Sequence, residues 1–425
     1  MVIKCAQSLI GKNKIPFTSY DFGWVVLCIG MAIGAGIVYM PIQVGVKGLW
    51  VFVFAIALSY PAIHYLQDLY LKTLTQTEEC DDYANIISQY LGKNWGIILG
   101  IAYFLMLLTG ILNYSTGIVN DSATYLQSYH LTTGNLSDEL WYGLVILVIM
   151  VLIANQGEKF LFKISGPMII FKLIVIVFLG VIMIPYWKLS NISGFTEILP
   201  FLRDVLLTLP FTLFSILFVQ ILNPMNIAYR KVEKDPVIAS YRAIRASRLA
   251  YVILAIAVLF FAFSFSFAIT KDEATSALNQ NISALALASQ IIPGYLVNIM
   301  SVLLNIFAIM TAFFSLYLGL KESVQGLVMN ILTRIYDKDS LNINLITLST
   351  ISGIIIFLWG WVTFDFSVML LMQLSMPVFG LVTCFVPFYL VYKVDSLANL
   401  RSPSNYYVAF YGVLISISPF LKFFE

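Results

Sequence analysis

Lys172 is the residue whose type and position most directly indicate chemistry. It lies twelve residues into an apolar stretch that begins near Phe160, and at ~1.5 Å per residue a helix would carry it roughly 18 Å deep into a membrane. A lysine at such depth costs about 2.5 to 3.5 kcal/mol on insertion. We therefore expect it to face the protein interior, where it is either neutral or paired with a carboxylate. The acidic residues Asp68, Glu322 and Asp121 are all predicted nearer to helix ends.

Glycines and a proline interrupt the first apolar stretch of the chain. The sequence Gly34-Ala-Gly-Ile-Val-Tyr-Met-Pro41 follows Gly30 and is itself followed by Gly45 and Gly48. Each of these residue types lowers helical propensity, so the segment can unwind. Unwound backbone at mid-membrane offers amide donors and carbonyl acceptors to a polar ligand, and it is tolerated only beside a cavity. A competing interpretation is close helix packing through small residues.

Two prolines, Pro210 and Pro224, bracket a second interrupted stretch that contains Phe214, Ser215 and Gln220. Because an internal proline removes a helical hydrogen bond, a break between the two prolines has a local cause. An ordinary proline-kinked helix would also fit this pattern. Further polar residues at depth could line a cavity or form hydrogen bonds between helices, and these are Asn113, Tyr114, Gln373 and Ser375.

The composition places these residues in a membrane protein. Of 425 residues, 60% are hydrophobic and 11% are charged, whereas soluble proteins average about 25% charged. A net charge of +2 excludes the electrostatic footprint of a nucleic-acid-binding protein. The four cysteines lack the spacing of metal ligands, and only His64 and His130 are present. We therefore predict no catalytic residues, no metal site and no cofactor.

Eleven apolar stretches are candidates for spanning helices, which need roughly 20 apolar residues, although the fourth is short. Their approximate ranges are 22–45, 49–72, 95–127, 140–155, 160–187, 203–228, 245–270, 294–330, 343–363, 366–392 and 406–423. No soluble domain or linker interrupts them, so the chain is expected to form one transmembrane domain over 1–425. With the N-terminus inside, 18 of the 24 Lys and Arg lie on the cytoplasmic side and five outside. This bias matches the positive-inside rule, and the basic run from Arg230 to Arg248 is interpreted as a topology anchor.

The first interrupted stretch resembles the signature of the amino acid/polyamine/organocation superfamily, in which a Gly-x-Gly is followed five residues later by Pro. The closer likeness is to the hydroxy and aromatic amino acid permeases, of the serine/threonine permease type. This likeness covers nearly the whole chain. Its motifs here are Gly34, Gly36 and Pro41, then Asp21-Phe-Gly-Trp24, Gly166-Pro167, and the segment Thr311 to Glu322.

The resemblance implies an all-α polytopic membrane protein with a leucine-transporter-like fold. In that fold two five-helix repeats are inverted relative to each other, and spans one and six are broken. The repeats would occupy about 20–188 and 202–393, and an extra helix would follow at 406–423. The N-terminus would lie inside the cell.

The resemblance also implies where ligands bind. In proton-coupled relatives a lysine of span five replaces a sodium ion that bridges spans one and eight, and Lys172 matches that position. Its ammonium group would then contact the Ala32 and Ile33 carbonyls and the Thr311 hydroxyl. The substrate's carboxylate and ammonium groups would meet spans one, six and three. The residues expected there are Gly34, Ala35, Gly36, Ile37, Phe214, Ser215 and Asn113.

The resulting hypothesis is a secondary transporter that carries a small amino acid together with a cation across a bacterial inner membrane. A proton is the first choice of cation, and a serine- or threonine-like amino acid is the first choice of substrate. Span six carries Phe214, Ser215 and Gln220 where the family pattern has a Trp and an Asn-His pair, so an aromatic substrate stays open. Sodium coupling stays open too, and so does a channel, although no repeated pore motif or ring of like charges is present. The predicted partners are the amino acid, the co-transported ion and the lipid bilayer, and no nucleic acid is expected.

Overall fold

The computed structural model is all-helical over the residues that it describes. These residues are 15–77, 82–128, 130–134, 136–191, 197–279, 295–336, 342–364, 371 and 374–421. Their side chains are described except at 35–39, 128, 158, 277–279, 295–298 and 301.

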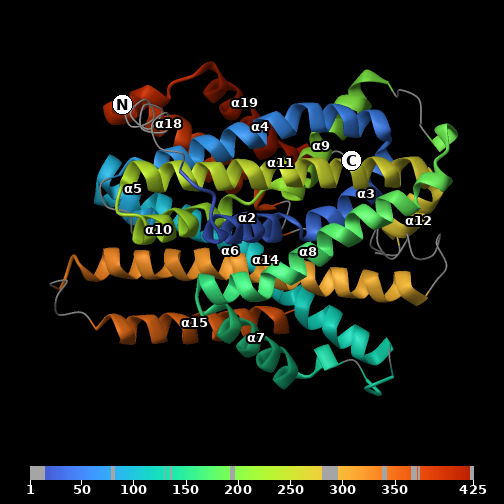
Figure 1. The fold of residues 1–425 in the computed structure, drawn as a ribbon, viewed down its shortest axis with the longest axis horizontal. Helices are drawn as coiled ribbons and strands as arrows, with labels where there is room; N and C mark the ends of the chain where they lie inside the picture. Colours follow the sequence, from blue (N-terminus) through green and yellow to red (C-terminus); the bar gives the residue numbers. More distant parts are fainter. Residues whose placement is uncertain are drawn as a thin grey trace.

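Long helices run side by side along the longest dimension of the molecule (Figure 1). The first half of the chain forms α2 (Ser19–Ala32), α3 (Ala35–Lys47), α4 (Leu49–Thr75), α5 (Tyr83–Leu91), α6 (Lys93–Ser128), α7 (Leu140–Ala154) and α8 (Glu158–Ile182). The second half forms α9 (Ile198–Ile216), α10 (Leu222–Val232), α11 (Pro236–Ala268), α12 (Lys271–Asn279), α14 (Tyr295–Leu332), α15 (Ile343–Thr363), α17 (Met376–Gly380), α18 (Val386–Lys393) and α19 (Pro403–Leu421). A π-helical turn, Leu381–Phe385, joins α17 to α18.

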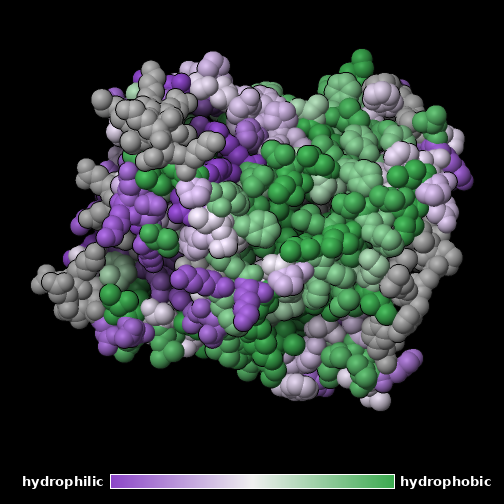
Figure 2. Space-filling view, viewed as in Figure 1, coloured by the Kyte–Doolittle hydropathy of each residue, from purple (hydrophilic) through white to green (hydrophobic). Residues whose placement is uncertain are grey.

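Eight helices of the described chain are long and apolar enough to cross a membrane. Their outer faces expose large hydrophobic side chains such as Ile174, Ile256 and Leu348, each at least 60% exposed, which in water would be unfavourable over so wide an area. Figure 2 shows the hydrophobic residues as a broad band, with hydrophilic residues gathered at the end where α5 and α10 lie. The protein is therefore a multi-pass membrane protein.

The predicted stretches each overlap a helix or a pair of helices in the described residues. The fourth is short, as expected, because α7 has only 15 residues. The first and sixth stretches are each divided into two helices, namely α2 with α3 and α9 with α10. Helix α2 packs against α8, α11 and α14, so the divided first stretch lies in the interior of the bundle.

Candidate functional site

The first helix break lies at Ile33 and Gly34. Helix α2 ends at Ala32 and α3 begins at Ala35, and the Gly34 N–H donates to the Ala32 carbonyl at 2.8 Å. In a continuous helix this N–H would instead donate to Gly30. The break therefore frees the Gly30 carbonyl, and a glycine is needed at position 34 because a Cβ would collide with the Tyr114 hydroxyl.

Lys172 occupies the space beside this break. Its Nζ donates to the Ile33 carbonyl at 3.0 Å, to the Gly30 carbonyl at 3.4 Å and to the Thr311 Oγ1 at 2.6 Å. The side chain is fully buried, and within the described part of the chain it forms no ion pair with a carboxylate. The carbonyls at the C-terminal end of α2 carry a partial negative charge, which favours a cation there. The structure thus brings together Lys172, Ile33 and Thr311, with Gly30 in the place predicted for Ala32.

Thr311 joins α14 to the same break. Its hydroxyl lies 3.1 Å from the Gly30 carbonyl and 2.8 Å from the Phe307 carbonyl of its own helix. Gly30 is where three helices meet, because a Cβ there would lie 2.5 Å from Ile169 of α8 and 3.3 Å from the Thr311 Cβ. Lys172 of α8, Gly30 of α2 and Thr311 of α14 therefore form one compact junction.

The second helix break lies at Leu217 and Phe218, within the predicted interval. Leu217 is extended, with φ −83° and ψ 129°, and α10 begins only at Leu222. The freed N–H of Phe218 donates to the Gln67 Oε1 of α4 at 2.9 Å. Pro224 causes no break because it is the third residue of α10, where its missing N–H has no helical partner in any case.

A small cavity lies between the two breaks. Its volume is about 30 Å³, space for roughly two water molecules. Two buried carbonyl oxygens beside it, Asn113 Oδ1 and Gln220 Oε1, have no hydrogen-bond partner among the described residues. The rings of Phe214 and Phe379 meet edge to face at 5.2 Å. The full lining is Met31, Thr109, Gly110, Asn113, Tyr114, Phe214, Gln220, Ser375 and Phe379.

The predicted substrate residues divide into three groups. Asn113 and Phe214 line the cavity, whereas the Ser215 hydroxyl lies 3.2 Å from the Tyr60 hydroxyl and donates to the Thr212 carbonyl at 2.7 Å. Gly34 lies at the break itself. The side chains at Ala35, Gly36 and Ile37 are outside the described residues, as is Gln373.

Several lining residues could not be found from the sequence. Met31 and Thr109 gave no signal, because one is an ordinary apolar helix residue and the other a single hydroxyl. Phe379 lies two residues after Pro377 in span ten. Only its ring contact with Phe214 in the structure identifies it as a lining residue. Gln67 is a polar residue within the predicted stretch 49–72, and this signal could have been found in the sequence.

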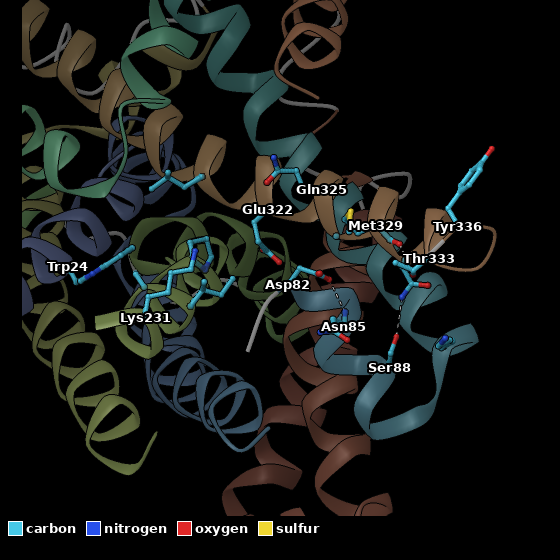
Figure 3. Close-up of a pocket in the computed structure, with 17 residues that line it drawn as sticks. Trp24, Asp82, Asn85, Ser88, Lys231, Glu322, Gln325, Met329, Thr333 and Tyr336 are labelled. Atoms are coloured by element: carbon cyan, nitrogen blue, oxygen red, sulfur yellow. Dashed lines mark hydrogen bonds between the residues drawn. The ribbon is translucent and has the colours of Figure 1, made fainter. Parts of the chain in front are cut away.

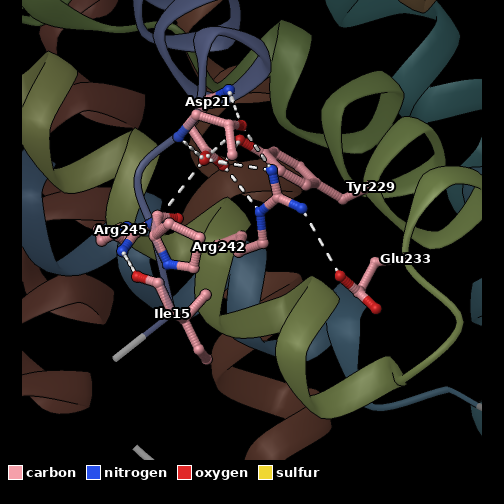
Figure 4. Close-up of polar contacts among 8 residues, drawn as sticks. Ile15, Asp21, Tyr229, Glu233, Arg242 and Arg245 are labelled. Carbon is pink, nitrogen blue, oxygen red and sulfur yellow. Dashed lines mark hydrogen bonds and ion pairs between the residues drawn. The ribbon is translucent and has the colours of Figure 1, made fainter. Parts of the chain in front are cut away.

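An ion-pair cluster holds the start of α2 (Figure 4). Asp21 is fully buried, and its carboxylate accepts hydrogen bonds from Arg242 Nε at 3.0 Å and from the Tyr229 hydroxyl at 2.8 Å. Arg245 approaches the same carboxylate at 3.5 Å. Thr18 is the N-cap of α2: its hydroxyl oxygen accepts the Asp21 N–H, and the Asp21 carboxylate accepts the Thr18 N–H. Two members of the basic run predicted as a topology anchor thus also join spans one, six and seven.

Comparisons with known proteins agree with this architecture. The solved structure of Mhp1, a nucleobase-cation-symport-1 family transporter in a closed conformation, superposes with a TM-score of 0.58 at 11% identity, covering 95% of this chain and 92% of the other. This likeness shows a shared fold.

Sequence relatives cover nearly the whole chain. A serine transporter of Escherichia coli O157:H7 is 47% identical over 97% of this chain and 94% of its own length. The threonine/serine transporter TdcC of Edwardsiella tarda is 24% identical over 95% and 96%. The family model of the tryptophan/tyrosine permease family matches residues 18–394. This chain therefore belongs to the tryptophan/tyrosine permease family and is a membrane transporter of amino acids rather than an enzyme.

Proposed function

We propose that this permease carries serine, or a similarly small hydroxy amino acid, into a bacterial cell together with a proton. The relatives named as serine and threonine/serine transporters support the substrate. We further propose eleven spans with the N-terminus inside, two inverted repeats at about 20–188 and 202–393, and an extra helix at 406–423. The fold shared with Mhp1 and the two broken helix pairs support this arrangement.

The observation that carries the coupling proposal is the position of Lys172. Its ammonium group is held by two carbonyls of span one and a hydroxyl of span eight, so it fills the role of a bound cation between these spans. Loss of its proton removes the charge that binds the carbonyl dipoles, and the attachment of α2 to α14 weakens. Because the two conformations then differ in proton affinity, a proton gradient can drive the conformational change.

The two breaks supply complementary groups for an amino acid. Helix α3 begins at Ala35, so the N–H groups of its first turn have no helical partner and favour the substrate carboxylate. The unpartnered oxygens of Asn113 and Gln220 can accept hydrogen bonds from the ammonium group or from a side-chain hydroxyl. Gly34 lets this backbone approach Tyr114 closely.

The lining of the cavity favours serine over an aromatic substrate. The family description names tryptophan and tyrosine, which makes an aromatic substrate the second candidate. However, the cavity of about 30 Å³ is narrowed by Phe214 and Phe379. An indole or phenol ring would require both rings to move, whereas a hydroxymethyl group needs much less space.

Uptake into proteoliposomes tests the proposal. Labelled serine, threonine, tryptophan and tyrosine would be offered under an inward proton gradient and, separately, under an inward sodium gradient. We expect serine to accumulate with the proton gradient alone. Lys172→Ala should abolish gradient-driven accumulation while retaining serine counterflow, because exchange needs no net proton transfer.

Three outcomes would contradict parts of the proposal. Accumulation of tryptophan but not serine would show that the substrate is aromatic. Dependence on sodium alone would show that the coupled ion is sodium. Normal accumulation by Lys172→Ala would show that the lysine is only structural. Counterflow itself separates a carrier from a channel, because only a carrier is stimulated by unlabelled substrate inside.

A further inference from the structure

A second, larger cavity lies at the predicted cytoplasmic end of the molecule (Figure 3). Its volume is about 650 Å³, which holds many water molecules. Trp24 of α2, residues of α5 and α10, and one face of α14 line it. Figure 3 shows Glu322 of α14 and Asp82, which precedes α5, projecting toward each other in this cavity.

Glu322 stands at the boundary between this cavity and the protein interior. Its Oε1 accepts the N–H of Tyr83, the first residue of α5, at 2.6 Å, and its Oε2 accepts the Tyr103 hydroxyl at 3.4 Å. The titratable groups close to it are Tyr70, Asp82, Tyr83 and Tyr103. Lys93 and Lys231 line the same cavity.

One face of α14 connects Glu322 to the Lys172 site. At 3.6 residues per turn, Thr311, Ser315, Leu318 and Glu322 recur on the same side of the helix. The first touches Lys172, and the last two line the cavity. Glu322 follows Thr311 by eleven positions, which is about 16 Å along the axis, and Ser315 is the polar residue between them on this face.

Helix α2 covers this face turn by turn. The Gly30 carbonyl lies 3.1 Å from the Thr311 hydroxyl, and the Leu27 carbonyl lies 3.4 Å from the Ser315 hydroxyl. One turn further along α2, Trp24 already lines the cavity, and its buried indole N–H has no partner in the structure. A small outward movement of α2 would therefore extend the water of the cavity past Leu318 to Ser315 and Thr311.

We infer that Glu322 is the acceptor that receives the proton of Lys172 and releases it to the cytoplasmic cavity. The inference rests on the proton coupling proposed above. The Lys172 ammonium loses one proton and becomes a neutral amine, and the proton passes through the hydroxyl groups of α14 and cavity water to the Glu322 carboxylate. The resulting carboxylic acid then gives the proton to water, and Glu322 returns to its charged form.

Glu322→Gln tests the acceptor. The amide oxygen can still accept the hydrogen bond of the Tyr83 N–H, so the contact with the start of α5 is kept. The titrating carboxyl group is lost. In proteoliposomes containing a trapped pH-sensitive dye, addition of serine should acidify the lumen with the wild-type protein. The variant should acidify it more slowly, on the order of 10²-fold for the loss of a positioned proton acceptor, while serine counterflow at equal pH continues.

Asp68→Asn is the matched control. Asp68 pairs with Lys72 and Arg248 at the same end of the molecule but does not line the cavity, so its loss should leave acidification unchanged. Normal acidification by Glu322→Gln would overturn the inference, and so would equal loss of acidification and counterflow in a variant that elutes as a folded protein. If serine causes no acidification with the wild-type protein, the proton coupling proposed above is wrong, whatever the role of Glu322.

A second pair of variants tests the route of the proton along α14 and leaves the hydrogen bond between Glu322 and the Tyr83 N–H unchanged. Ser315→Ala removes the hydroxyl between Lys172 and the cavity and should slow acidification but not counterflow. Ser323→Ala removes a buried hydroxyl of the same helix that lies on another face. Equal acidification rates for these two variants would overturn the route along α14.

Discussion

At the scale of single residues, the proposed function depends on polar groups that have lost their helical partners. The Gly30 carbonyl is free because Gly34 donates to Ala32, and Lys172 uses the freed oxygen. The sequence predicted Lys172, Ile33 and Thr311 as neighbours through family resemblance, but it placed Ala32 where Gly30 lies. The exact carbonyl depends on where the helix ends, and glycine content alone does not determine that residue.

Gly34→Ala should strongly impair transport. The added Cβ would collide with the Tyr114 hydroxyl and lie 2.9 Å from its ring, so the break must shift and the Lys172 ligands with it. We expect serine uptake to fall by on the order of 10²-fold, as for other small misplacements at a functional centre. Initial rates of uptake at equal protein level provide the measurement.

Gly353→Ala is the control for this substitution. Gly353 lies within α15, and a Cβ there meets no atom within 4 Å. Uptake should be unchanged, and thermal stability should rise slightly, because alanine favours a helix over glycine by about 0.5 to 1 kcal/mol. Equal uptake by both variants would show that the close approach at Gly34 is not required.

At the scale of helices, the sequence predicted which elements are broken. It did not predict the contacts that hold the broken ends. Glycine acts locally, so the break in span one was visible in the sequence. The break in span six lies within the predicted interval, but neither of the two bracketing prolines stands at it. The partners of the broken ends come from distant helices. Gln67 of α4 receives the Phe218 N–H, and Ser215 turns to Tyr60 rather than to the cavity. Such contacts depend on how helices are rotated about their axes, which composition does not specify.

Gln67→Leu should destabilise the second break. The substitution keeps a similar size but leaves the buried Phe218 N–H without an acceptor, which costs about 1 to 3 kcal/mol. We expect a lower thermal unfolding midpoint in detergent, together with reduced serine uptake. An unchanged midpoint would mean that Gln67 does not support the break.

Asp21→Ala should detach the start of α2 from spans six and seven. It leaves the guanidinium groups of Arg242 and Arg245 without their shared carboxylate, and breaking a buried ion pair costs about 3 to 5 kcal/mol. Glu233 lies 3.6 Å from Arg242 and still pairs with its guanidinium group, which limits the loss of stability. Thermal unfolding of Asp21→Ala, Arg242→Gln and the double variant would measure the coupling, and additive effects would contradict it.

At the scale of the whole molecule, apolar composition and helix length predicted the fold class, while the family pattern predicted the arrangement. Eight helices of the described chain qualify as spans individually. Others do not, since α2 and α3 are separate halves and α7 has only 15 residues. Broken and short helices fail any test of length, although they belong to the same bundle. The count of eleven spans therefore depends on treating α2 with α3 as one crossing and on adding α7 and α19 to the eight.

Cysteine labelling should establish the orientation of the molecule. In a cysteine-free background, Asp138→Cys before α7 should react with an impermeant maleimide in intact cells. Ser396→Cys after α18 should react only after permeabilisation. Both positions are exposed, so accessibility of the side chain does not distinguish them. The opposite labelling pattern would place the N-terminus outside.

The surroundings of Lys172 have a consequence for the electrical behaviour of the transporter. Its ligands are neutral, and no carboxylate pairs with it in the described part of the chain. If it carries the proton, then the loaded carrier with a zwitterionic substrate bears one uncompensated positive charge, and the empty, deprotonated carrier bears none. An electric field across the membrane would act on the loaded step, at about 2.3 kcal/mol per charge for each 100 mV. An inside-negative potential alone would then drive uptake, even with equal pH on both sides.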